Sequence, residues 1–155
     1  MTITMRLDGF RELEQELARL GSHTTRRASA RRALRKTAQP MADLAQSLAP
    51  RGDTNTLAPS ISIGTKLSKR QAGMHRKMFR DDRAAVEMFI GAGPLSSAHT
   101  QEFGTIHHAP QPFLRPAWDQ DQRAMLDRLK AELWADIERA VARAERRAAR
   151  LAARG

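Results

Sequence analysis

The stretch Gln101–Trp118, QEFGTIHHAPQPFLRPAW, constrains the fold more than any other part of the sequence. Three of its residues are prolines, at positions 110, 112 and 116. Each proline fixes φ and removes a backbone donor, so this peptide cannot pair freely with a sheet. We therefore expect a stiff, extended connector that locks the following helix onto the rest of the fold.

This stretch predicts the backbone conformation of one residue and the burial of two others. Gly104 separates the expected end of a strand, at Glu102 and Phe103, from the proline segment. Such a junction favours a backbone conformation that is closed to residues with a Cβ. Phe113 and Leu114 are large apolar side chains on a rigid peptide, and we expect them to be buried within the subunit or against a neighbour.

Beyond the prolines the sequence predicts one long helix, over about residues 117–150. Its apolar residues recur at helical spacing. They are Trp118, Met125, Leu129, Leu133, Ile137, Val141, Ala144 and Ala148. The last residues of this helix have few large apolar groups, so we expect this end to fray or to contact a neighbour.

On the N-terminal side of the connector the sequence predicts a small antiparallel sheet. Residues 60–68 and 85–91 alternate between apolar and polar side chains, and 97–103 is expected to form a third strand. The 16-residue basic segment Lys69–Ala84 is long for a hairpin connection, so we expect a mobile loop, either simply solvated or facing DNA or a partner. Its candidate contact residues are Lys69, Arg70, Arg76, Lys77 and Arg80.

The first part of the chain predicts a strand and two helices. Residues 2–7 alternate as a strand, and 9–20 follow with helical spacing. A second helix is expected over about 25–49, with a kink or break near Gln39 because Pro40 lies inside it. Residues 50–59 are expected to form a loop. The whole chain, 1–155, is thus predicted to be a single α+β domain.

Composition narrows the classes of protein that the chain can belong to. Cysteine is absent, which excludes disulfides, thiolate metal sites and a cysteine nucleophile. No run of 18 apolar residues occurs, so no membrane span is expected. The formal net charge is +10, and it is spread evenly, as +4, +3 and +3 over residues 1–50, 51–110 and 111–155. Such a surface suits nucleic acid or acidic proteins, although arginine-rich codon usage explains it equally well.

The sequence contains no recognisable catalytic signature. It has no nucleophile elbow, zinc-protease motif or phosphate-binding loop, and we expect no catalytic residues, no cofactor and no metal. His99, His107 and His108 lie near Glu102 in the sequence and offer single metal ligands. Ordinary hydrogen bonding in a loop is the favoured interpretation of these histidines.

Two short motifs in the right order resemble the signature of a phage protein family. The chain has a turn of Glu102, Phe103, Gly104 and Thr105, followed by a run of Pro112, Phe113, Leu114, Arg115, Pro116 and Ala117 that enters the last helix. This pattern resembles the tail-completion or neck proteins of phages with long non-contractile tails, similar to gene product ten of a lambdoid phage. Asn55 stands where the family has a glycine, and asparagine tolerates the left-handed conformation next best.

The resemblance implies a non-enzymatic virion structural protein at the head–tail junction, synthesised in the bacterial host cytoplasm. It implies a homo-oligomeric ring, of six subunits, that joins a head connector to the tail terminator or tube while DNA crosses its channel without sequence preference. Such a ring needs a heterologous interface. The last helix on one side and the sheet or proline arm on the other are the candidate contacts. The alternative from another class is a small basic DNA-binding protein, which would explain the charge but not the two motifs.

Overall fold

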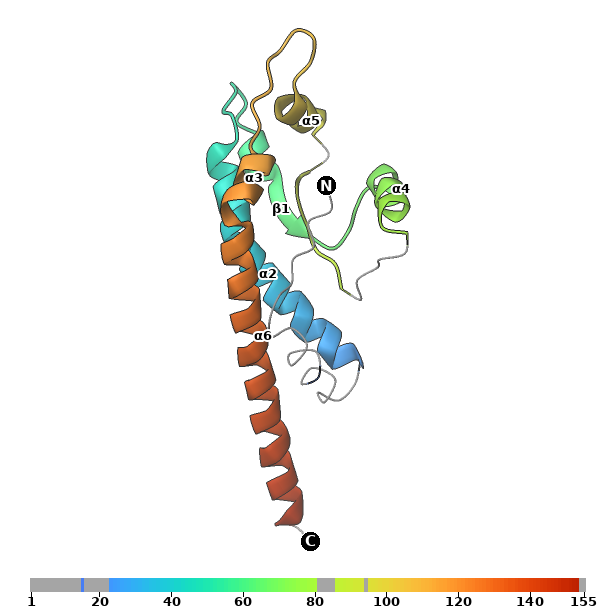
Figure 1. Cartoon of the computed structure of the whole chain (residues 1–155), viewed down its shortest axis with the longest axis vertical. Coiled ribbons are helices and arrows are strands. Elements are labelled where there is room, and N and C mark those ends of the chain that lie inside the picture. Colours follow the sequence, from blue (N-terminus) through green and yellow to red (C-terminus); the bar gives the residue numbers. More distant parts are fainter. Residues whose placement is uncertain (1–14, 16–22, 81–85, 94, 154–155) are drawn as a thin grey trace.

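The computed structural model describes residues 15, 23–80, 86–93 and 95–153 (Figure 1). Its helices are α2 (His23–Leu48), α3 (Leu57–Ser60), α4 (Lys69–Met78), α5 (Ser96–Phe103) and α6 (Leu114–Ala152). Its strands, β1 (Ile61–Gly64) and β2 (Phe89–Ala92), pair antiparallel. The α+β class with a small sheet and a long last helix is therefore confirmed. The strand expected at 2–7 and the helix expected at 9–20 lie outside the described residues.

The pairing of α2 with α6 forms the main axis of the molecule (Figure 1). Ala33 on α2 packs against Leu133 and Ile137 on α6, and all three are buried. Ser29 donates a hydrogen bond to Asp136, whereas Lys36, further along α2, forms an ion pair with Glu132, further back along α6. Because higher numbers on α2 meet lower numbers on α6, the two helices run antiparallel.

Pro40 lies inside α2, which nevertheless continues from His23 to Leu48 without a break. Of the kink or break expected near Gln39, the break is therefore wrong. A proline removes one helical hydrogen bond and disturbs the carbonyl groups of the preceding turn. The Nη2 atom of Arg128 on α6 donates to the carbonyl oxygen of Thr37, at 3.2 Å, in that turn. The carbonyl that loses its helical donor is that of Lys36, and Arg128 donates to the next one, so this contact holds α6 against the turn that precedes Pro40.

A second core lies where the two strands and the start of α6 meet the C-terminal half of α2. Its buried residues come from α2 and the segment that follows it, from α3, from β1 and from the entry to α6. They are Met41, Ala45, Ala49, Leu57, Ile61, Phe113 and Ala117. The strands pair over four residues each, with Ile63 opposite Ile90. Both are shorter than the strands expected at 60–68 and 85–91, and α3 occupies part of the expected loop 50–59.

The third strand expected at 97–103 is wrong, because this segment forms helix α5. Ala98 and Glu102 are four residues apart, so the helix turns both toward the protein: Ala98 packs on the core and Glu102 is buried. Residues four positions apart lie on the same face of a strand and also on the same face of a helix, so the sequence of such a short segment does not distinguish the two. Contacts with α6 therefore decide the conformation.

The expectation of a loop over 69–84 is also wrong for most of that segment. Lys69–Met78 forms helix α4, and residues 81–85 lie outside the described residues. Ser68 begins the helix with a capping box: its side chain accepts from the backbone N–H of Gln71, and the Gln71 side chain accepts from the backbone N–H of Ser68. Such a box satisfies two donors that a helix start leaves free, which stabilises a helix with little tertiary packing.

The long last helix is confirmed, and it begins earlier than expected, at Leu114. Its apolar residues are covered to different extents. Leu133 and Ile137 are buried, whereas Val141 beyond them is 40% exposed and Trp118 is 46% exposed. Figure 1 shows the C-terminal part of α6 continuing past the N-terminal end of α2, with no other described helix beside it. None of the described helices is long and apolar enough to cross a membrane.

Candidate assembly site

Glu102 joins the two halves of the motif that the sequence singled out. Its carboxylate accepts three backbone hydrogen bonds at the start of α6, from the N–H groups of Phe113 (2.8 Å), Leu114 (3.0 Å) and Arg115 (3.0 Å). A helix start leaves four N–H groups without helical partners. The fourth position is Pro116, which has no N–H group. One carboxylate and one proline therefore leave no unsatisfied donor at this helix start.

We call this contact between Glu102 and the start of α6 the joint. Its electrostatics favour the charged form of the Glu102 carboxylate. Burial alone would raise the pKa of Glu102, which is only 7% exposed. The three backbone hydrogen bonds and the nearby Arg115 charge act in the opposite direction and hold the pKa below its usual value. The positive end of the α6 dipole points at the same group. The charged carboxylate of Glu102, on α5, is thus hydrogen-bonded to the start of α6, and we call this interaction the tie between the two helices.

Gly104 has the conformation that the sequence predicts. Its φ is +76° and its ψ is −179°, a region open almost only to glycine. A Cβ at this position would lie 2.9 Å from the carbonyl oxygen of His108 and 2.9 Å from the ring nitrogen and Cδ of Pro110. The conformation reverses the chain after α5 and brings the proline segment back against it. The backbone N–H of Gln111 then donates to the carbonyl oxygen of Gln101, at 2.7 Å.

Phe113 connects the joint to the hydrophobic core. Its side chain is fully buried in the cluster that includes Ala45 and Ile61, which confirms the expected burial. Leu114 is half-buried at the edge of the same cluster. On the outer side the Arg115 guanidinium lies 5.3 Å from the centroid of the Phe103 ring, a cation–π contact at the surface. The two motifs are therefore one structural unit.

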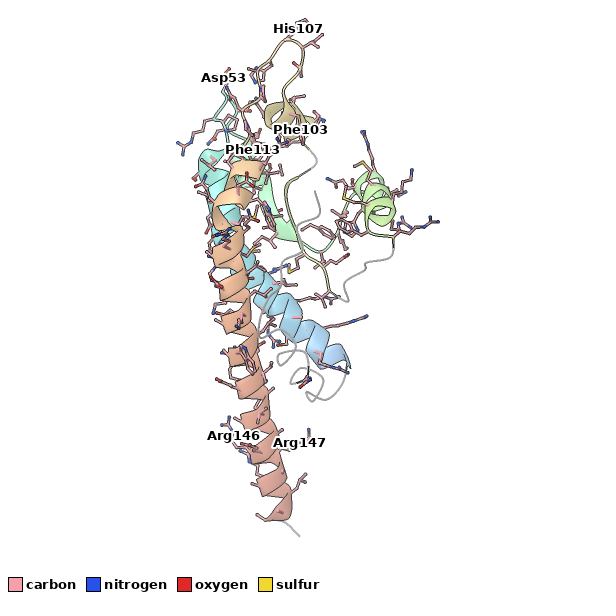
Figure 2. The ribbon with its side chains drawn as sticks, viewed as in Figure 1. Asp53, Phe103, His107, Phe113, Arg146 and Arg147 are labelled. Atoms are coloured by element: carbon pink, nitrogen blue, oxygen red, sulfur yellow. The ribbon has the colours of Figure 1, made fainter. Side chains whose placement is uncertain are left out.

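The joint holds a loop that protrudes from the end of the molecule (Figure 1). Thr105 pairs with His108 across its narrow end, and Pro112 is exposed where the loop returns to α6. Figure 2 shows His107 at the apex, and the neighbouring Ile106 is 94% exposed. His108 lies 3.1 Å from the side chain of Gln101. No group of three or more side chains suited to a metal occurs in the part of the chain that the structure describes.

The basic candidates lie elsewhere, on α4, which stands apart from α5 and the protruding loop (Figure 1). All of them are exposed: Lys69, Arg70, Arg76, Lys77 and, just after the helix, Arg80. Met74 and Met78 lie on the neighbouring face of α4 and are 54% and 77% exposed. His75 contacts the rings of Phe79 and Phe89 and holds the helix near β2. The structure thus separates these basic residues from the motif around Glu102.

Sequence reasoning missed three features of this site. It named Glu102 without its capping role, which depends on a contact between α5 and α6. It gave no role to Ile106 or to the methionines of α4, which are exposed apolar side chains. The capping-box pattern of Ser68 and Gln71 was a signal for α4 that the sequence already contained.

The described surface of this α+β fold exposes apolar side chains on the loop and on α4, and basic side chains on α4 and at the end of α6. A family model matches residues 11–104, more than half of the chain, and it places the chain among bacteriophage tail components. The chain belongs to the family described as "Bacteriophage HK97-gp10, putative tail-component". The match includes Glu102 and Gly104 and ends before the proline run that completes the motif. No curated protein and no solved structure matches the chain significantly.

Membership in this family confirms the resemblance to phage tail proteins that the two motifs indicated. The protein is therefore a structural component of a phage tail, and a tail component is part of the virion. It works in contact with other tail proteins.

Proposed function

We propose that this tail component completes the head-proximal end of the tail as a ring of six subunits, without enzymatic activity. In this position it contacts the head connector on one face and the tail terminator or tube on the other. DNA passes through its channel without sequence-specific contacts. The proposal extends the family assignment by the resemblance of the two motifs to neck proteins.

The observation that carries the proposal is the position of two exposed apolar surfaces on separate parts of one subunit. One is the loop tip, with Ile106, and the other is the methionine face of α4, with Met74 and Met78. Two different patches that meet between copies form a heterologous interface, and such an interface closes into a ring when the rotation permits. A rigid joint at Glu102 would hold the loop tip at the fixed angle that closure requires.

The same observation refines the role proposed for the basic segment. A channel lining needs charge alone, whereas α4 pairs its charged side with exposed methionines. Methionine side chains adapt to a protein surface. We therefore propose that α4 clasps a neighbouring protein, with Lys69, Arg70, Arg76, Lys77 and Arg80 forming the polar rim of that contact.

The experiment is the mass of the purified protein, measured by light scattering, together with negative-stain images. The protein should form rings, and Ile106→Ser should shift it toward monomers while its melting temperature stays unchanged, because Ile106 makes almost no contact within the subunit. Leu151→Ser is the matched control, since Leu151 is also an exposed aliphatic residue but lies near the end of α6. Rings that persist in Ile106→Ser, or that disappear equally in the control, would contradict the proposed interface.

A further inference from the structure

The end of α6 concentrates arginine on one of its faces. The residues are Arg139, Arg143, Arg146, Arg147 and Arg150. With about 3.6 residues per turn, all five fall within a sector of about 100°. Four of them, from Arg143 onward, line one open depression on the surface. The two glutamates of this stretch, Glu138 and Glu145, fall outside the sector.

Most of this arginine face is not neutralised. Arg139 pairs with Asp136, and the Nε atom of Arg146 donates to the carbonyl oxygen of Ala142, at 3.0 Å. Among the residues that the structure describes, Arg143, Arg147 and Arg150 have no acidic partner. Four guanidinium groups within about two helical turns repel one another in water unless anions approach them. The face is therefore suited to a polyanion.

The shape of this segment is also suited to a nucleic acid. Figure 2 shows Arg146 and Arg147 on either side of α6, where no other described helix runs beside it. The remaining positions are mostly alanine, which combines high helix propensity with a small side chain. The helix is thus formed before binding, and its backbone can come close to a ligand. A helix about 10–12 Å across fits the major groove of B-DNA, which is about 12 Å wide.

We propose that the face formed by Arg143, Arg146, Arg147 and Arg150 binds the phosphate backbone of double-stranded DNA without sequence preference. An acidic protein fits less well, because a protein interface needs apolar anchors and the exposed large apolar side chains of this end, Val141 and Leu151, both lie outside the arginine sector. For its place in the virion this inference rests on the proposed function, with DNA passing the head–tail junction. The binding itself is a property of the isolated protein.

The test measures binding of the full chain to a fluorescent 20-base-pair duplex of random sequence, by anisotropy, from low to moderate salt. Each phosphate contact contributes a slope of about −0.9 to log K against log salt, so four contacts contribute about −3.6. Replacing the four arginines with glutamine should remove most of that slope and weaken binding at low salt at least tenfold. The same chain with the exposed residues Arg31, Arg51, Lys66 and Arg123 replaced by glutamine is the control of equal charge, and it should keep the wild-type slope within about one unit.

Four results would overturn the inference. Three of them are measured with the duplex: the wild-type protein fails to bind it at low salt, the variant of the arginine face keeps the wild-type slope, or the control variant loses as much slope as that variant. Equal affinity for poly-glutamate of matched charge would also overturn it, in favour of an acidic protein partner. Circular dichroism checks that both variants keep their helix content. If rings form and DNA binding fails, this inference alone falls; if DNA binds and rings never form, the proposed ring falls.

Discussion

At the scale of single residues, Glu102 is the side chain that links helix α5 to the start of helix α6. A buried carboxylate is costly unless hydrogen bonds satisfy it, and here three backbone N–H groups do so. The donors belong to the residues that start α6, so the side chain ties two helices together and also begins one of them. Glu102 and Phe113, eleven residues apart in the motif, meet in this contact.

Replacing this carboxylate with its neutral isostere tests the tie. Glu102→Gln keeps the shape but turns an amide group toward N–H donors, so we expect the free energy of unfolding to fall by about 1–3 kcal/mol. Urea denaturation at pH 7 measures the change. Asp119→Asn is the control, because Asp119 is exposed near the start of the same helix. A loss no larger than the control's would mean that the tie does not stabilise the fold.

The pKa of Glu102 also predicts a pH dependence. Because the folded-state pKa lies below the ordinary value of 4.5, charged Glu102 contributes stability at pH values above about 4.5. This contribution disappears as the pH falls through the lower, folded-state pKa. The difference in unfolding free energy between the wild type and Glu102→Gln should therefore shrink as the pH falls below 4.5. A difference that stays constant down to pH 3 would contradict this account.

Gly104 gives a second prediction at this scale. Valine at this position would place its Cβ 2.9 Å from backbone atoms and would need a φ of +76° that it rarely adopts. Gly104→Val should lower the melting temperature by at least several degrees or prevent folding. Gly91→Ala is the control, because nothing lies within 4 Å of its added Cβ. Equal melting temperatures for the wild type and Gly104→Val would show that the turn tolerates a side chain.

At the scale of elements, the sequence predicted what local patterns determine. The apolar spacing of α2 and α6 identifies both helices, and the prolines identify the connector between α5 and α6. Helix α5 was missed because its eight residues fit either a strand or a helix, and burial of Glu102 against α6 decides between them. The capping role of Glu102 was missed for the same reason, since it depends on residues eleven to thirteen positions away.

At this scale, we predict that the exposed methionines of helix α4 are needed for joining heads to tails. Met74→Ser combined with Met78→Ser removes exposed apolar surface from α4 and leaves all its charges. The isolated subunit should keep its stability within about 0.5 kcal/mol, as surface substitutions usually do. Particles made with this variant should contain unjoined heads and tails, counted by electron microscopy. The serine replacement of Lys69, Arg70, Arg76 and Lys77 should have a smaller effect on joining; the reverse order would favour charge over apolar contact.

At the scale of the whole molecule, the arrangement is a compact end and a long helix that leaves it (Figure 1). The compact end contains the sheet, the joint at Glu102 and both exposed apolar surfaces. The free end of α6 carries the arginine face. This separation would let a subunit contact its neighbours with one end and DNA with the other. That the whole chain forms a single domain stays a prediction.

The position of the protein in assembled particles tests the central claim most directly. Particles made with a gold-labelled tag after Gly155 can be imaged by electron microscopy, with untagged particles as the control for stray gold. We expect the label at one site per particle, at the head-proximal end of the tail. Label along the tail tube, at the distal tip or within the head would contradict the assignment to the head–tail junction.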